Sequence, residues 1–168
     1  MSKLTSLNLS GNKINNFELM NLPELKELRL HGNVLNIIHP MAFMNVPQLQ
    51  YLYMRDNLIG SLDGNRLQAF RNLEILDVTN NLLQKLPELK DLTNLKQVRL
   101  DGNLIEKVET LAFSNNPKLQ LISLQVSRFF SLSYTIFLKN FSTLGQRKVF
   151  KKEGRGKIFI FFYILAVF

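Results

Sequence analysis

Apolar and polar positions recur with one fixed spacing along most of the chain. The stretch Leu49–Ile59 has apolar residues at relative positions 1, 4, 6 and 11 and an asparagine at position 9. The set occurs five times, and such repeats must be found before any fold is assigned. The five sets are Leu4, Leu7, Leu9, Asn12 and Ile14; Leu25, Leu28, Leu30, Asn33 and Leu35; Leu49, Leu52, Met54, Asn57 and Ile59; Leu73, Leu76, Val78, Asn81 and Leu83; and Leu95, Val98, Leu100, Asn103 and Ile105.

The central apolar alternation of each set has a period of two residues, which predicts a short β-strand with one buried face. Successive first leucines are 21, 24, 24, 22 and 24 residues apart, counting a weaker sixth set that begins at Leu119. Periods of this length predict a solenoid in which each coil packs only on its neighbours. Because every coil runs the same way, we expect the strands to pair in parallel.

The recurring asparagine solves a hydrogen-bonding problem. The chain turns away from each strand with its backbone groups inside the structure, and those groups need partners. An amide side chain both donates and accepts. We therefore expect a structural column that bridges neighbouring turns, made of Asn12, Asn33, Asn57, Asn81 and Asn103.

A second apolar pattern precedes each strand, at six and three residues before the first leucine. These pairs are expected to fill the side of each coil that lies opposite the strand. They are Leu19 and Leu22, Phe43 and Val46, Leu67 and Phe70, and Leu89 and Leu92; in the next copy the pair is Phe113 and Asn116, which weakens the pattern.

The spacing LxxLxLxxNxL resembles the leucine-rich repeat family from Leu4 to about Val126. The resemblance implies an α/β fold: a right-handed solenoid, or horseshoe, with a parallel β-sheet on its concave side and loops or 3₁₀ turns on its convex side. Residues 1–126 would form this domain, with five clear repeats and a degenerate sixth. Residues 127–168 form a basic, phenylalanine-rich tail outside the pattern.

Charge and composition change this picture little. The net charge of +8 divides unequally, because residues 1–126 hold 13 Lys and Arg against 12 Asp and Glu, whereas residues 127–168 hold 8 against 1. The basic character belongs to the tail, so it does not favour nucleic-acid binding by the repeats. The chain has no cysteine, which excludes disulfides and thiolate chemistry.

The tail admits three interpretations. Its final apolar run, Ile158–Phe168, has 11 residues, fewer than a membrane-spanning helix needs. It could be a strand or helix that covers the open end of the solenoid. It could be an interfacial membrane anchor, with residues 148–168 contacting lipid. It could also be foreign sequence from a mis-spliced or truncated product, which the abrupt end of the repeat pattern favours.

The subtype of repeat bears on the compartment. Residues 42–49 and 112–119 resemble the phenylalanine-containing convex segment of 24-residue repeats that are common in secreted and cell-surface proteins. The shorter segment 86–94 also resembles intracellular scaffold repeats, which keeps a cytoplasmic regulatory role open. No signal peptide precedes Leu4. We expect a fragment of a longer extracellular or cell-surface protein of the adhesion, receptor or matrix type.

The outward positions of the strands should form a continuous binding surface, since adjacent strands lie about 4.8 Å apart. Tyr51, Tyr53, Arg29 and Arg55 should meet near its centre, and Tyr and Arg are the types enriched among interface hot spots. An open sheet offers area rather than an enclosed pocket, so the expected partner is a protein. The predicted partner-binding residues are Arg29, His31, Tyr51, Tyr53, Arg55, Asp77, Arg99 and Asp101.

Little in the sequence favours catalysis. The chain has two histidines and none of the common phosphate-binding, zinc-protease or serine-hydrolase motifs. Asp77 and Asp101 should lie on adjacent strands, but Arg99 beside them favours an ion pair over a shared proton. We therefore expect no enzymatic activity, no cofactor and no metal site.

Overall fold

The computed structural model of the chain describes residues 3–16, 21–39, 42–62, 67, 70–106, 112–125, 147–153 and 157–163, with side chains described only as far as Leu124. Six short strands follow one another at the repeat positions, and two longer strands come after them. They are β1 (Ser6–Asn8), β2 (Glu27–Arg29), β3 (Tyr51–Tyr53), β4 (Ile75–Asp77), β5 (Gln97–Arg99), β6 (Leu121–Gln125), β7 (Arg147–Glu153) and β8 (Lys157–Tyr163).

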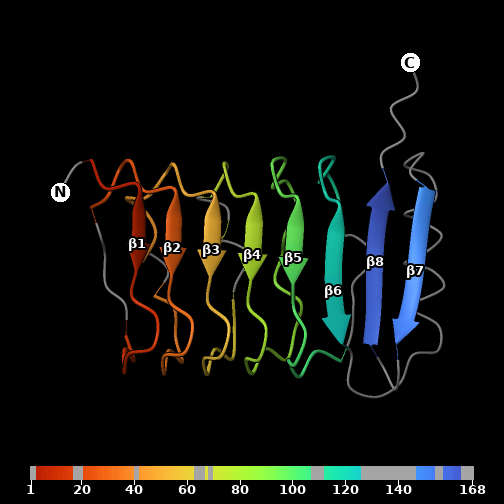
Figure 1. The fold of residues 1–168 in the computed structure, drawn as a ribbon, viewed down its shortest axis with the longest axis horizontal. Coiled ribbons are helices and arrows are strands. Elements are labelled where there is room, and N and C mark those ends of the chain that lie inside the picture. The colour runs from red at the N-terminus through yellow and green to blue at the C-terminus, as the bar shows by residue number, and fades with distance from the viewer. Residues whose placement is uncertain are drawn as a thin grey trace.

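The first six strands form one parallel sheet in sequence order (Figure 1). The register pairs equivalent repeat positions, so that Leu28 aligns with Leu52 and Leu52 with Leu76. The chain runs down each strand, returns behind the sheet and moves on to the next strand, which makes the solenoid right-handed (Figure 1). The predicted parallel, right-handed solenoid is confirmed. The class label α/β overstates the helix, because Leu67 is the single helical residue in the described part of the chain.

Two antiparallel strands continue the sheet beyond the last coil. β8 pairs with β6, aligning Ile122 with Ile160, and β7 pairs with the outer side of β8. This pairing agrees with the interpretation of the tail as a strand at the open end of the solenoid, and β8 includes Ile158–Tyr163 of the apolar run. Among the described residues, no helix has the length and apolar character needed to cross a membrane.

The inward side chains of the strands form the core. From Leu25 onward, the apolar residues of the repeat positions are buried, most of them completely. The first coil is different, because Leu4, Leu7, Leu9 and Ile14 are only partly buried. In the described part of the solenoid one neighbouring coil covers them, where inner coils have two.

The convex side has its own apolar column. Leu22, Val46, Phe70 and Leu92 are buried at equivalent positions, and the Phe70 ring lies 4.9 Å from that of Phe43. Asn116 takes the next place in the column, where its Nδ2 donates to the carbonyl oxygens of Leu89 and Leu92 at 2.8 and 3.0 Å. Leu19, predicted to join this side, lies outside the described residues.

The turn after each strand depends on a left-handed residue at repeat position 8. This place holds Gly11, Gly32, Asp56, Asn80 and Gly102, all with φ between 54° and 69°. Glycine adopts this conformation without strain, and Asn and Asp tolerate it better than other residues. A glycine, asparagine or aspartate at position 8 therefore lets the chain turn, with little backbone strain, immediately before the asparagine at position 9.

Gly102→Ala is expected to lower the free energy of unfolding by about 2 kcal/mol, whereas Gly11→Ala should cost about 1 kcal/mol. Both residues are left-handed, but a Cβ on Gly102 would lie 2.1 Å from Oδ1 of Asn80 and 3.3 Å from its Cα, while a Cβ on Gly11 would meet nothing within 4 Å. Urea unfolding followed by circular dichroism measures both. Equal losses would show that backbone strain alone sets the cost.

Candidate functional site

The asparagine column fixes the strand ends that carry the outward side chains. Asn57 Nδ2 donates to the carbonyl oxygens of Leu30 and Met54, both at 3.0 Å, and its Oδ1 accepts from the amide of Leu35 at 3.1 Å. Asn33, Asn81 and Asn103 repeat this arrangement one coil apart, and all four are buried. Each therefore ties its own coil to the preceding one.

Asn12 begins the column and differs from the other four. It is exposed, and its Nδ2 donates only within its own coil, to the carbonyl oxygens of Leu9 and Ser10 at 2.9 and 3.2 Å. No coil precedes it in the described solenoid. Asn12 thus occupies the repeat position of the asparagine column without donating to another coil.

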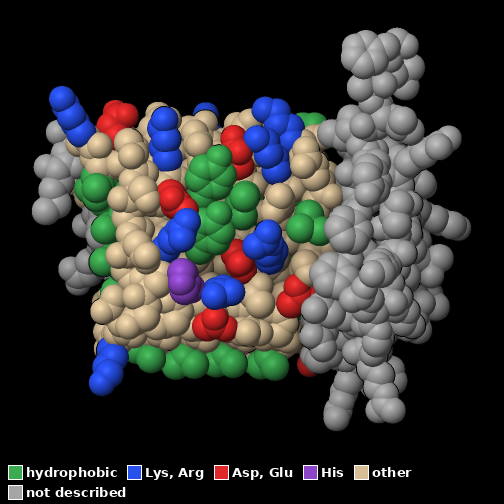
Figure 2. Space-filling model, viewed as in Figure 1, with side chains coloured by type: hydrophobic (Ala, Val, Ile, Leu, Met, Phe, Trp, Pro, Cys, Tyr) green, Lys and Arg blue, Asp and Glu red, His purple; other side chains and the backbone are tan. Residues whose placement is uncertain are grey.

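The register places the predicted binding residues in adjacent rows on one face of the sheet, here called the sheet face. Arg29 aligns with Tyr53, Tyr53 with Asp77, and Asp77 with Arg99. In the neighbouring row, Glu27 aligns with Tyr51 and Tyr51 with Ile75. The apolar centre of this face is surrounded by cationic and acidic side chains (Figure 2).

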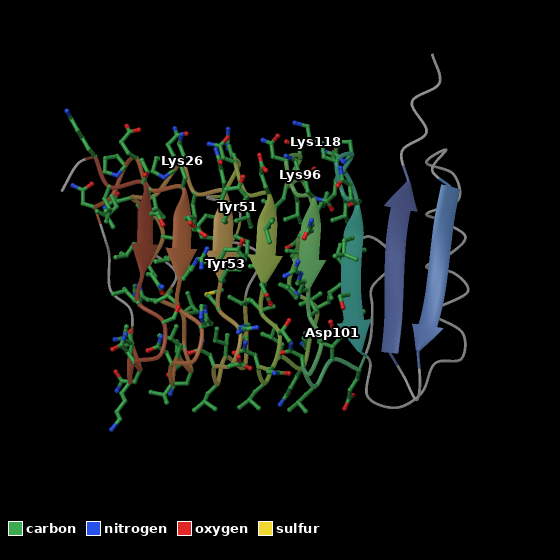
Figure 3. All side chains as sticks on the ribbon, viewed as in Figure 1. Lys26, Tyr51, Tyr53, Lys96, Asp101 and Lys118 are labelled. Atoms are coloured by element: carbon green, nitrogen blue, oxygen red, sulfur yellow. The ribbon has the colours of Figure 1, made fainter. Side chains whose placement is uncertain are left out.

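Tyr51 and Tyr53 form the centre of the sheet face on β3 (Figure 3), and both are half-buried. The guanidinium carbon of Arg29 lies 5.6 Å from the centre of the Tyr53 ring, within the range of a cation–π contact. Partial burial raises the pKa of the Tyr53 hydroxyl, and the Glu27 carboxylate acts in the same direction. The hydroxyl therefore stays protonated at neutral pH and can donate to a partner.

Glu27 holds Arg29 in this position. Arg29 Nε donates to Glu27 Oε1 at 2.9 Å, and its Nη2 lies 2.7 Å from the same oxygen. These contacts are the main cause that lowers the pKa of Glu27, with a further hydrogen bond from Ser6 and with desolvation opposing. The ion pair is therefore intact at neutral pH and weakens as the pH falls through the lowered pKa of Glu27.

A second polar chain orders Tyr51. Its hydroxyl donates to Glu74 Oε2 at 3.4 Å, and Lys96 Nζ donates to the same oxygen at 2.8 Å. This hydrogen bond is the main cause that raises the pKa of Lys96. Sequence reasoning missed Glu74 and Lys96, which precede their strands. Both residues occupy the same repeat position, next to the row that contains Tyr51, and this shared position could have identified them from the sequence.

Asp77 corrects one expectation. It was predicted to be an exposed member of the binding row, but it is only 5% exposed. Its short side chain lies between the longer Tyr53 and Arg99, its Oδ1 accepts from the amide of Thr79 at 3.1 Å, and Arg99 Nη1 lies 3.7 Å from its Oδ2. Asp77 therefore supports Arg99 from below the surface instead of offering its carboxylate to a partner.

The remaining predicted residues lie at the carboxyl ends of the strands. His31 Nδ1 and Ser10 Oγ share a hydrogen bond of 3.0 Å, and Arg55 Nε lies 3.5 Å from Asp56 Oδ2. Asp101 accepts a hydrogen bond from Ser123 Oγ through Oδ2. His31 and Arg55 come two residues after the ends of β2 and β3. Asp101 follows β5 and lies toward the last coil (Figure 3).

The face can provide shape, aromatic surface and fixed charges. Within the described residues, no three His, Asp or Glu side chains gather as metal ligands do. The arginine side chains are pre-ordered by acidic neighbours, which lowers the entropy lost when a partner binds. Fold and site together define a solenoid repeat protein with an open, patterned sheet face.

Three family models match the chain, all of them described as leucine-rich repeats. One matches residues 23–83, a two-copy model matches residues 71–113, and a single-repeat model matches residues 3–23. The chain therefore belongs to the leucine-rich repeat family. The leucine-rich repeat-containing protein egg-6 of Caenorhabditis elegans is 77% identical over 56 residues, which is 33% of this chain and 6% of that protein.

Solved structures show the same fold. An internalin (inlF) of Listeria monocytogenes has a TM-score of 0.58 at 24% identity, covering 77% of this chain and 36% of its own. TLR13, solved in a TLR13–ssRNA13 complex, has a TM-score of 0.58 at 21% identity. The match covers 81% of this chain and 24% of the TLR13 chain. The plant peptide hormone receptor RGFR1, solved with RGF2, has a TM-score of 0.58 at 27% identity. The match covers 71% of this chain and 20% of the RGFR1 chain. The chain spans a third or less of most of these relatives.

Proposed function

We propose that this chain is a protein-interaction module that binds a protein partner through the sheet face, centred on Tyr51 and Tyr53. The observation that carries the proposal is the central position of the two tyrosines, with Arg29 stacked near Tyr53 and Glu27 fixing that arginine. Tyrosine and arginine are enriched among residues that dominate interface energies. Such residues contribute most to binding near the centre of an interface, which is where Tyr51 and Tyr53 lie on the sheet face.

The open form of the face favours a protein over a small molecule. The outward rows extend across the parallel strands, whereas a small-molecule site is usually a concave pocket that encloses most of its ligand. His31 and Arg55 follow β2 and β3, and Arg99 lies on β5, so polar groups border the tyrosines as in the rim of a protein interface. The chemistry is thus non-covalent recognition, with no catalytic step.

We propose further that the chain is part of a secreted or cell-surface protein. The phenylalanine-containing convex segments support this, because Phe43 and Phe113 are buried as in that subtype of repeat. The similarity in fold to an internalin and to a plant hormone receptor is consistent with it. The whole protein would be longer, since the chain corresponds to a small part of egg-6.

The double variant Tyr51→Ala/Tyr53→Ala is expected to weaken partner binding by more than about 2 kcal/mol, or roughly 30-fold in Kd. The matched control is Asn8→Ala, which lies in the same row as Tyr53 but on β1 at the edge of the sheet. Partners would come from a screen of secreted and cell-surface ectodomains, and biolayer interferometry would give each Kd. A loss in the control as large as that in the tyrosine variant would contradict a central hot spot.

Single-stranded RNA is a second candidate partner, favoured by one observation. Two tyrosine residues lie on β3 with Arg29 beside the Tyr53 ring, and aromatic rings bordered by cations are the groups on which unpaired bases stack. TLR13 shows that a chain of this fold is found with RNA. Fluorescence anisotropy with a labelled oligouridine tests this: binding that needs both tyrosines and weakens steeply with salt would favour RNA over a protein.

A further inference from the structure

A row of exposed aliphatic side chains follows the lateral edge of the solenoid, just after the asparagine column. Repeat position 10 holds Val34, Leu58, Leu82 and Leu104, which are 41%, 48%, 44% and 47% exposed. We call these four residues the apolar edge. Their side chains lie along the lower border of the molecule, where Figure 2 shows a continuous apolar band. The repeat pattern leaves position 10 unspecified, so the sequence motif does not reveal the row.

The backbone prevents these side chains from turning inward. The amides of Leu58, Leu82 and Leu104 donate to carbonyl oxygens of the preceding coil at 2.8, 3.0 and 2.9 Å. On either side, position 9 is a buried asparagine and position 11 a fully buried aliphatic residue. The interior is thus occupied, and position 10 is held outward in every coil.

Single exposed leucines are ordinary on protein surfaces, but a contiguous row marks a contact surface. Among the residues whose side chains are described, the other large exposed apolar ones are Ile37 and Met44, and both lie outside position 10. Four consecutive coils therefore present the same class of side chain at the same place. In the first coil the position changes to Lys13, which is exposed.

The two ends of the apolar edge carry opposite charges. Lys13 stands at the first end, in the same repeat position as the four aliphatic residues. Glu106, two residues after Leu104, is exposed at the other end. The equivalent places in the coils between, Asn36, Gly60 and Gln84, are uncharged. The edge is therefore apolar in the middle, positive at one end and negative at the other.

We propose that the apolar edge binds the same edge of a second copy of this chain, in a two-fold antiparallel arrangement. A two-fold interface brings the same patch of both copies together, so Lys13 of each copy would face Glu106 of the other. The spacing also fits, because both copies repeat their side chains at the same interval of about 4.8 Å. This contact leaves the sheet face free, so it stands independently of the proposed function.

The size of the edge sets the strength of the contact. Stable dimers bury about 800 Å² on each partner, which is more than four half-exposed aliphatic side chains can supply. The dimer is therefore weak and depends on protein concentration. In a longer chain with more repeats, the same edge would be extended and the association stronger.

Sedimentation velocity of the whole chain over a concentration series tests the contact. The unaltered chain should show a monomer–dimer equilibrium, and Leu58→Glu/Leu82→Glu should weaken it by more than tenfold, because burying carboxylates is costly. Met44→Glu, an exposed apolar position away from the edge, is the matched control and should change nothing. Circular dichroism confirms that each variant folds.

Charge exchange tests the antiparallel geometry. Lys13→Glu alone and Glu106→Lys alone should each weaken the dimer roughly tenfold, because each places like charges together at both ends. An equimolar mixture of the two variants should dimerise again, since each copy then supplies the charge that the other lacks. A mixture that stays as weak as its components overturns the antiparallel arrangement.

Other occupants give different outcomes. A chain that remains monomeric at every concentration, or an association unaffected by Leu58→Glu/Leu82→Glu, overturns the proposal. Vesicles of phosphatidylcholine provide the lipid arm of the same test. If the monomeric chain binds those vesicles and loses this binding in the double variant, the edge contacts lipid and the dimer is wrong.

Discussion

Replacing Asn57 by alanine is expected to lower the free energy of unfolding by about 3 kcal/mol. The substitution leaves the amide of Leu35 without its acceptor. It also removes one of two side-chain donors to each of the carbonyl oxygens of Leu30 and Met54, which keep Asn33 and Asn81 as donors. These groups lie inside the solenoid, where an unpaired buried group costs about 1–3 kcal/mol. Some relaxation and water entry keep the total below the sum of the separate costs.

Asn12→Ala is the matched control and should cost less than about 1 kcal/mol. Asn12 has the same repeat position, but it is exposed and bonded only within its own coil. Both losses can be measured by urea unfolding at neutral pH, with circular dichroism as the signal. Similar losses at the two positions would show that the asparagine acts through its own turn, and that the bonds between coils add little.

The strand register was predictable from the sequence because the repeat length fixes which residues are neighbours. Aligning the five motifs placed Arg29, Tyr53, Asp77 and Arg99 in one row, and the parallel sheet has that row. Parallel pairing between identical units leaves only one register that buries every inward leucine. The asparagine column followed from the same alignment, together with the need to pair buried backbone groups.

Burial within the sheet face was not predictable from alternation alone. Alternation gives the direction in which a side chain points, but exposure also depends on the length of its neighbours. Asp77 points outward and is still buried, because Tyr53 and Arg99 beside it are longer. The roles of Glu27 and Glu74 as supports for Arg29 and Tyr51 likewise depend on side-chain conformations that a motif does not specify.

The end of the solenoid was the least predictable part. The tail lacks the repeat pattern, so no alignment could assign a register to it. The antiparallel pairing of Leu121–Gln125 with Lys157–Phe161 depends on contacts between segments far apart in sequence. The apolar edge escaped prediction for the opposite reason: position 10 lies inside the motif, but the motif allows any residue there.

Phe70→Ala is expected to have the largest effect on stability, lowering the free energy of unfolding by about 4 kcal/mol. Phe70 is completely buried on the convex side, and its ring packs 4.9 Å from that of Phe43. Truncation removes most of the side chain and leaves a cavity between coils, which the hydrogen-bonded strands and asparagine column keep from collapsing. The loss combines the lost burial, the lost aromatic contact and the cavity.

Phe70→Leu separates volume from aromatic character and should cost about 1 kcal/mol. Leucine is the natural residue at the same place in two other coils, as Leu22 and Leu92, and both are buried. Thermal and urea unfolding of the two variants measure the difference. If Phe70→Leu were as costly as Phe70→Ala, the contact with the Phe43 ring would dominate over cavity formation. The loss of about 1 kcal/mol that we expect for Phe70→Leu would instead show that the convex column accepts any large apolar residue. This tolerance would explain why the sequence pattern there is loose while the pattern in the strands is strict.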